Sequence, residues 1–235
     1  MNLITLVVPC YNEIESLPTL IKKINGADDK INFLILDNGS TDGTKDYLYR
    51  IKQDLNKNVE LYFIEKNEGY GHGVYSGLKV CNTKYIGWIH GDLQFDFDNL
   101  KKVTNVLLEK NNLGTKIFYK GIRTGRSAID KFFSFFMGII ASLILGRKLY
   151  EINAQPTIFH RSLLNDIKDP PLDFNFDAYI YWLAITKSFD IERDYFLFPP
   201  RKFGISKWDI GLFSKLKFSL SLIKYFFELK SNKDI

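Results

Sequence analysis

The sequence is short of the features that mark secreted or membrane-spanning proteins. Its 235 residues include only two cysteines, Cys10 and Cys81, too few for a disulfide framework. The N-terminus runs straight into a strand-like segment, without a signal-peptide pattern. The apolar stretch Phe132–Leu145 has about 14 residues, whereas a helix needs about 20 to span a bilayer. We therefore expect a reduced, intracellular protein, in which Phe132–Leu145 is a buried core helix in preference to an interfacial one.

The sequence also lacks the glycine-rich motifs of two large nucleotide-binding classes. No phosphate loop ending in Gly-Lys-Ser/Thr is present. Asn67–Val74 resembles a dinucleotide fingerprint, but its third glycine is misplaced and no acidic residue follows at the usual distance. A dehydrogenase is therefore disfavoured. These glycines either let a ligand approach a helix N-terminus closely or form an ordinary tight turn.

The net charge of +5 is concentrated near the C-terminus. Residues 201–233 carry eight Lys or Arg, against Asp209 and Glu228, so the rest of the chain is close to neutral. Such a segment suits phosphates or an anionic membrane surface, or it is the solvated face of a helix. No nucleic-acid-binding motif accompanies the charge, so we expect no nucleic acid partner.

The first half of the chain alternates apolar runs with helical patterns, which is typical of a parallel sheet with helices on both faces. We expect strands at Leu3–Val8, Ile31–Leu36 and Val59–Ile64. Pro9 is expected to end the first strand, and Asn12 to cap the helix that follows.

The second half continues this pattern and then changes. A strand at Thr115–Tyr119 is expected to lead into a basic loop, Lys120–Arg126, and a last strand covers Ile191–Pro199. Leu212–Leu229 has a helical pattern with a narrow polar stripe and a broad apolar face. We expect a catalytic unit over residues 1–210 and an amphipathic tail over 211–235 that contacts a membrane surface or a second subunit.

The stretch Trp88–Asp96 follows an apolar, strand-like run and turns abruptly polar. Ligands of open α/β sheets bind beyond the carboxyl ends of the strands. A carboxylate such as Asp92 can there hold a divalent metal that clamps a diphosphate. On this stretch alone, an ordinary polar turn before a helix is an equally good interpretation.

Five stretches together resemble the motifs of family 2 glycosyltransferases, in the same order. Val7–Glu13 resembles the opening motif, Leu36–Thr44 the Asp-Asp/Asn-Gly-Ser-x-Asp-Gly-Thr motif, and Asn67–Gly71 the third. Gly91–Gln94 resembles the Asp-x-Asp-x-Gln metal motif of the branch that includes dolichyl-phosphate mannose and glucose synthases. Arg201–Trp208 resembles the late Arg-x-x-Gly-x-Ser-Lys motif of that branch.

The resemblance implies an inverting nucleotide-diphospho-sugar transferase with the Rossmann-like GT-A fold, a mostly parallel sheet flanked by helices. It implies a UDP- or GDP-sugar donor and a Mg²⁺ or Mn²⁺ ion held by Asp92, with His90 beside it. The implied catalytic residues are Asp92, Gln94, Arg201 and Lys207. The implied nucleotide-sugar contacts are Pro9, Tyr11, Glu13, Asp37, Asn38, Gly69 and Arg123.

The acceptor is the least specified part of the resemblance. We expect a polyprenyl phosphate at the cytoplasmic face of a membrane, because Leu212–Leu229 has a broad apolar face with lysines around it and Phe132–Leu145 is apolar. A lipid phosphate is already ionised and needs little or no general base. A glycan hydroxyl is the alternative acceptor and would need a base, for which Asp96, Asp177 and His90 are candidates. Asp96 as a helix cap and His90 as a strand-end residue are the simpler interpretations.

Two departures from the family pattern leave further alternatives open. His90 stands where the metal motif has its first Asp, and neutral histidine is a better ligand for Mn²⁺ than for Mg²⁺. Asn153–Phe159 stands where the family has Asp-Pro-x-Ser-Gly-Phe. A non-catalytic nucleotide-sugar-binding protein is therefore a second alternative, although the presence of Asp92, Gln94, Arg201 and Lys207 disfavours it.

Overall fold

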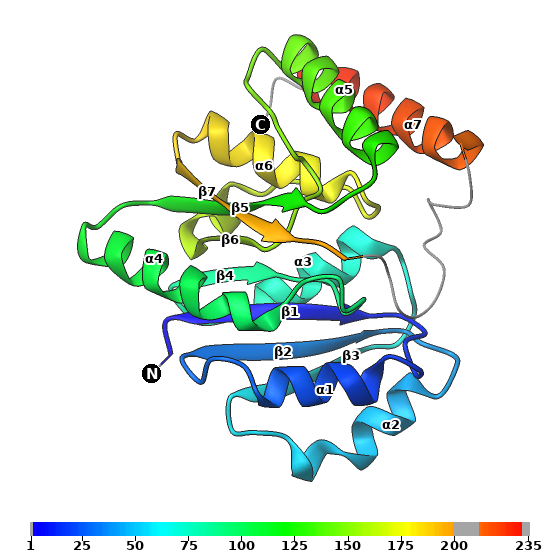
Figure 1. Cartoon of the computed structure of the whole chain (residues 1–235), viewed down its shortest axis with the longest axis vertical. Coiled ribbons are helices and arrows are strands. Elements are labelled where there is room, and N and C mark those ends of the chain that lie inside the picture. The colour runs from blue at the N-terminus through cyan, green and yellow to red at the C-terminus, as the bar shows by residue number, and fades with distance from the viewer. Residues whose placement is uncertain (1, 200–211, 232–235) are drawn as a thin grey trace.

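A seven-stranded sheet organises the computed structural model, which describes residues 2–199 and 212–231 (Figure 1). The strand order is β3-β2-β1-β4-β6-β5-β7, and only β6 runs antiparallel to its neighbours. The predicted mostly parallel α/β sheet is confirmed. The strands are β1 (Ile4–Cys10), β2 (Ile31–Asn38), β3 (Val59–Ile64), β4 (Tyr85–Trp88), β5 (Ile117–Thr124), β6 (Thr157–His160) and β7 (Asp190–Leu197).

Helices cover both faces of the sheet and enclose two apolar cores. One face carries α1 (Leu17–Asn25), α2 (Thr44–Arg50) and α4 (Leu100–Asn112). The other carries α3 (Tyr70–Val80), α5 (Ala128–Leu145), α6 (Phe176–Thr186) and α7 (Leu212–Ser231). Short 3₁₀ turns are η1 (Lys52–Asp54), η2 (Phe97–Asn99) and η3 (Arg161–Asp166).

Strand β1 shows why the sequence folds into this layered arrangement. Its side chains alternate, so that Leu6 and Val8 enter the core beneath α1 and α4 while Val7 enters the core beneath α3 and α6. Strands buried on both faces must be apolar along their whole length. The polar residues that follow such strands are therefore placed together at one edge of the sheet.

Two expectations near the start of the chain were wrong. Pro9 lies inside β1 and pairs with Leu36. Its nitrogen is on the β4 side of the strand, but the last β1–β4 pair is Val7–Trp88, so the missing N–H costs no hydrogen bond between the strands. Asn12 does not cap α1. It adopts φ 56°, and its Oδ1 accepts a hydrogen bond from the Thr41 N–H at 2.8 Å, which joins the loops after β1 and β2.

Two expectations in the second half were also wrong. Residues 120–124 are not a loop, because β5 continues to Thr124 and pairs with β7 along its length. Helix α5 is longer than predicted and is not a core helix: only Gly138 and Ala141 are buried. Of the described helices, α5 alone is long and apolar enough to cross a membrane by length and composition.

The predicted C-terminal helix is confirmed as α7. Leu222, Phe226 and Leu229 pack into the core shared with α6, and α7 lies against α5 (Figure 1). The division of the chain at residue 210 stays a prediction.

Candidate active site

The candidate site lies at the edge where β1, β2, β4 and β5 end and the antiparallel β6 begins. Two groups of residues meet there. The nucleotide half comprises residues 9–13, 37–38 and 67–71, after β1 and β2 and before α3. The transfer half comprises residues 90–94, 120–126 and 151–157, after β4 and along β5 and β6.

Asp37 is the least satisfied group of the nucleotide half. It is the register partner of Cys10, at the ends of β2 and β1. Its side chain is 0% exposed, and neither carboxylate oxygen has a hydrogen-bond partner. Burial, with the charges of Glu13 and Asp37, raises the pKa of the Cys10 thiol well above its usual range. A buried carboxylate without donors is costly, so this position calls for a ligand that brings N–H or O–H groups.

The other predicted nucleotide contacts surround Asp37. Pro9 pairs with Leu36, one position before Asp37 on the neighbouring strand. Tyr11 is partly exposed just beyond the end of β1. The Glu13 carboxylate accepts a hydrogen bond from the Ser16 hydroxyl at 2.7 Å, and the Asn38 amide donates to the Gly69 carbonyl at 3.1 Å.

Gly69 is required by the fold itself. Its φ is 127°, and a Cβ would lie 2.2 Å from the Leu172 carbonyl oxygen. This glycine therefore lets the start of α3 pack against the loop before α6.

Asp92 and His90 form the candidate metal position of the transfer half. The Asp92 carboxylate is 8% exposed and accepts a hydrogen bond from the Gln94 N–H at 3.1 Å. Its second oxygen lies 3.7 Å from His90 Nδ1. The Gln94 side-chain amide donates to the Pro199 carbonyl at 3.1 Å.

A carboxylate and an imidazole are competent ligands for a divalent cation. Searched over the described ranges alone, the chain offers no cluster of three or more His, Cys, Asp or Glu that could hold a metal. The donor set at Asp92 and His90 thus fits a cation that takes its remaining ligands from a diphosphate.

Two residues that sequence reasoning did not place in the site hold His90. The Gln155 side-chain oxygen accepts a hydrogen bond from the His90 N–H at 2.5 Å. The Tyr70 hydroxyl lies 2.9 Å from His90 Nε2 and 3.4 Å from an Asp177 carboxylate oxygen. Gln155 belongs to the Asn153–Phe159 segment, whose departure from the family pattern could have marked it as part of the site. Tyr70 stands among the glycines of the third motif, and nothing in the sequence distinguished it.

Asp177 and Asp96, two of the base candidates, are engaged elsewhere. Asp177 is 3% exposed, and burial raises its pKa, opposed by Lys120, His90 and Arg123. Asp96 accepts a hydrogen bond from the Asp98 N–H at 3.4 Å as the cap of η2, which confirms the simpler interpretation.

Lys120 is a buried amine in the wall of the transfer half. Its side chain is fully buried and donates to the Ala154 carbonyl at 3.0 Å and the Thr157 hydroxyl at 2.9 Å. Burial, together with the charges of Arg193 and Arg123, lowers its pKa to about 7, against the opposing charges of Asp177 and Glu151. A group with such a pKa changes charge near neutral pH.

Arg123, predicted at the phosphates, is paired within the protein. Its Nε donates to the Glu151 carboxylate at 2.7 Å, and a terminal nitrogen donates to Ser134 of α5 at 3.4 Å. Arg126 also donates to Ser134, at 2.7 Å. These bonds connect α5 to the transfer half. Arg201 and Lys207 lie outside the described residues.

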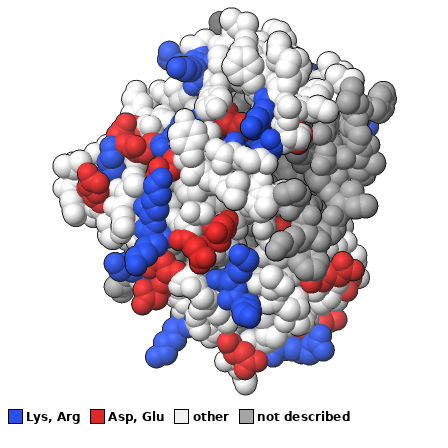
Figure 2. Space-filling model, viewed as in Figure 1, with Lys and Arg blue, Asp and Glu red and all other residues white. Residues whose placement is uncertain are grey.

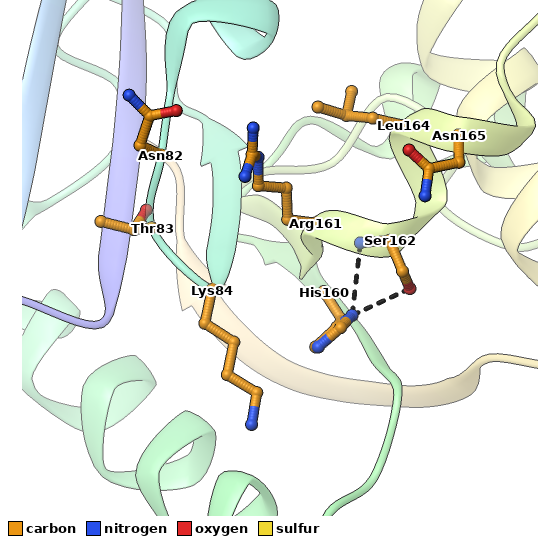
Figure 3. A pocket seen from close by; sticks show the side chains of 8 residues that line it. All are labelled: Asn82, Thr83, Lys84, His160, Arg161, Ser162, Leu164 and Asn165. Carbon is orange, nitrogen blue, oxygen red and sulfur yellow. Dashed lines mark hydrogen bonds between the residues drawn. The ribbon is translucent and has the colours of Figure 1, made fainter.

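A surface hollow of about 490 Å³ lies at the opposite, amino-terminal end of β4 (Figure 3). There the His160 ring is hydrogen-bonded to Ser162, and Lys84 and Arg161 rise from the wall. None of the predicted site residues lines this hollow, so it is separate from the candidate site.

Comparison with known proteins agrees with this geometry. The profile of the family "Glycosyl transferase family 2" matches residues 5–168. A dodecaprenyl-phosphate galacturonate synthase from Rhizobium johnstonii is 22% identical over 237 residues, covering 97% of this chain and 68% of that protein. An undecaprenyl-phosphate 4-deoxy-4-formamido-L-arabinose transferase from Pseudomonas syringae pv. syringae is 26% identical over 98 residues, covering 40% of this chain and 29% of that protein.

Solved structures with the same fold include two transferase complexes. The glucosyl-3-phosphoglycerate synthase of Mycobacterium tuberculosis, with Mn²⁺, UDP and phosphoglyceric acid, superposes with a TM-score of 0.71 at 16% identity, covering 98% of this chain and 79% of that chain. A mannosyltransferase from Pyrobaculum calidifontis, with GDP-mannose and Mn²⁺, gives a TM-score of 0.67 at 16% identity, covering 98% of this chain and 65% of that chain.

Proposed function

The chain belongs to glycosyl transferase family 2, and we propose that this glycosyltransferase moves a sugar from a UDP- or GDP-sugar to a polyprenyl phosphate, with inversion at the sugar carbon. The donor class follows the nucleotides bound by the superposed transferases. The acceptor class follows the names of the two sequence relatives.

The single observation that carries the donor assignment is the buried, unpartnered carboxylate of Asp37. A nucleobase and a ribose both present the donor groups that this carboxylate lacks. Asp37 would hold the base, with Pro9 and Tyr11 beside it and Glu13 and Asn38 framing the loop. The diphosphate would then extend from the nucleotide half toward Asp92.

Asp92 and His90 would hold a divalent cation. Gln94 would hold the turn after Asp92 in place through its N–H bond to the Asp92 carboxylate. When bound, the cation supplies positive charge against the departing diphosphate. Arg123, Arg201 and Lys207 would add fixed positive charge at the same end.

In the proposed reaction an acceptor phosphate oxygen forms the new bond to the anomeric carbon as the bond to the nucleoside diphosphate breaks. A lipid phosphate arrives ionised, so no side chain has to remove a proton. This suits a site whose base candidates are engaged: Asp96 caps η2 and Asp177 is buried beside Tyr70. Transfer to a glycan hydroxyl is the alternative, and Asp177 is the carboxylate it would need.

The outer face of α5 supports a membrane location for the acceptor. It exposes the large apolar side chains Ile129, Phe132, Phe135, Phe136, Ile139 and Leu143. Figure 2 shows mostly uncharged atoms at the top of the molecule, where α5 lies in Figure 1. Phenylalanine and leucine on one face of a helix are typical of binding at a lipid interface. We propose that this face rests on the cytoplasmic surface of the membrane and brings the transfer half to the lipid phosphate.

The donor assignment is tested by isothermal calorimetry with UDP- and GDP-sugars, each with and without Mn²⁺ or Mg²⁺. Asp37→Asn should weaken binding of the preferred nucleotide by on the order of tenfold to a hundredfold, because an amide cannot accept two hydrogen bonds from a base in the same way. The matched control is Asp46→Asn, an exposed acid on α2. Equal affinity of Asp37→Asn and the wild type would contradict the assignment.

A further inference from the structure

The ring of His90 is fixed by groups that lie outside its own motif. Its Nε2 is 2.9 Å from the Tyr70 hydroxyl of α3, and the two rings meet edge to face at 89° with centroids 5.3 Å apart. Its main-chain N–H is held by Gln155 at 2.5 Å. Tyr70 in turn stacks on Phe174, with ring centroids 4.6 Å apart. The imidazole therefore has one orientation in the site.

The hydrogen-bond direction along this chain of groups follows from Asp177. The Tyr70 hydroxyl donates a hydrogen bond to a carboxylate oxygen of Asp177 at 3.4 Å, and a phenol has only one proton to donate. Tyr70 therefore donates to Asp177, and its oxygen accepts from His90 Nε2–H.

A histidine protonated at Nε2 carries its lone pair on Nδ1. That atom faces an Asp92 carboxylate oxygen at 3.7 Å, too far for a hydrogen bond. Two ligand atoms that each lie about 2.1 Å from one cation are about 3.0 to 3.6 Å apart for angles of about 90 to 120°. The observed separation is close to this range, and both atoms present lone pairs.

We propose that Tyr70 and Asp177 are positioning residues that hold His90 in its Nε2–H tautomer, so that Nδ1 and Asp92 together bind the divalent cation. The inference rests on the proposed donor site at Asp92. Metal-binding histidines generally donate their second N–H to an oxygen acceptor, which fixes the tautomer and raises the basicity of the ligand. A nitrogen ligand in place of a carboxylate shifts the preference of the site from Mg²⁺ towards Mn²⁺.

The tautomer can be read directly, because the chain has only three histidines. Long-range ¹H–¹⁵N NMR of the full-length protein at about pH 8, where an ordinary histidine is neutral, reports which ring nitrogen carries the proton. We expect the Nε2–H form for His90 in the wild type and a mixture of forms in Tyr70→Phe, which keeps the ring contacts and loses only the hydroxyl. Tyr75→Phe, on the same helix, is the control and should leave His90 unchanged.

Metal binding supplies the second readout. Mn²⁺ affinity, measured by electron paramagnetic resonance in the presence of UDP or GDP, should fall about tenfold to a hundredfold in Tyr70→Phe. Asp177→Asn gives Tyr70 an N–H partner, so it should reverse the hydrogen bond and increase the Nδ1–H form of His90. This variant preserves the test if Tyr70→Phe fails to fold.

An Nδ1–H tautomer in the wild type, or unchanged Mn²⁺ affinity in Tyr70→Phe, would overturn the inference. The NMR measurement is made without a donor, so an error in the donor assignment cannot imitate an error in the tautomer. Failure of the wild type to bind Mn²⁺ with either nucleotide would overturn both the ligand assignment and the proposed donor site.

Discussion

The two halves of the catalytic edge are built in different ways. In the nucleotide half, backbone pairing between neighbouring parallel strands places Asp37 beside Cys10 and Phe63. In the transfer half, His90 is held by side chains 20 and 65 residues away, and Tyr70 in turn meets Asp177, 107 residues away. The first arrangement can be recognised as a local motif, whereas the second exists only once the chain has folded.

This difference suggests a division of labour. Local backbone geometry suits the proposed nucleotide site, because strand pairing alone sets the position of Asp37. Side-chain networks can change more easily, and they surround the positions where the metal motif and the Asn153–Phe159 segment depart from the family pattern. The predictions below test the transfer half and helix α5, which is bonded to it, from the largest expected effect to the smallest.

The largest effect is expected from Asp92→Asn. Loss of the carboxylate removes the main protein charge on the cation, so transfer should fall by about a thousandfold or more while the folded structure is kept. The measurement is steady-state turnover with the preferred donor and a polyprenyl phosphate. Asp98→Asn, an exposed acid in η2, is the charge-matched control. Unchanged turnover in Asp92→Asn would contradict the assignment of Asp92 as a metal ligand.

An intermediate effect is expected from Phe135→Ser combined with Phe136→Ser on α5. Both side chains are about half exposed, at 55% and 45%, and each should bury apolar area in lipid. We expect partition onto anionic vesicles, measured by flotation, to fall on the order of tenfold to a hundredfold, with turnover on a water-soluble acceptor unchanged. The control exchanges two exposed apolar residues elsewhere, Val80→Ser with Leu113→Ser. Equal flotation of the double variant and the wild type would show that α5 does not contact lipid.

The smallest effect concerns the buried amine of Lys120. Its folded-state pKa is lowered to about 7 from 10.5, so between these values the unfolded chain binds the extra proton. The free energy of unfolding should therefore rise with pH in this window, by up to about 1.4 kcal/mol per pH unit, and the cost of burying the charge is fully present below about pH 7. Lys120→Met should flatten this rise.

Urea unfolding at about pH 7.5 and pH 9 measures the slope. The control is Lys116→Met. Lys116 is exposed and lies immediately before β5, so this variant should keep the wild-type slope. If the unfolding free energy of Lys120→Met rises with pH as steeply as that of the wild type, the Lys120 ammonium is not desolvated, and water reaches the transfer half despite the burial of Lys120.

The sequence predicted the parallel sheet well, because strands buried on both faces are apolar throughout and are separated by helical patterns. The bounds of β3 agree with expectation to the residue. Pro9 was misread because its missing N–H costs a ladder hydrogen bond only if β4 extends far enough to pair there, which depends on the tertiary structure. Lys120 was misread because its strand pairs with β7, whose register partner Arg193 lies 73 residues later in the chain.

Helix α5 shows the limit of composition as a guide to burial. An apolar face all round predicts burial on average, but the fold covers only the side that includes Gly138 and Ala141. Helix α6 is similarly apolar and is buried from Phe176 to Ala184 because it packs directly on the sheet. Which of two such helices faces inward is decided by topology and cannot be taken from either sequence alone.

The central claim is that sugar passes from a nucleotide donor to a lipid phosphate. Its most direct test is mass spectrometry of the products formed from UDP- and GDP-sugars, Mn²⁺, a short polyprenyl phosphate and a competing oligosaccharide. We predict one glycosyl polyprenyl phosphate, with inverted configuration at the sugar carbon by NMR, and no elongated oligosaccharide. Transfer to the oligosaccharide alone, or donor hydrolysis without a lipid product, would contradict the account.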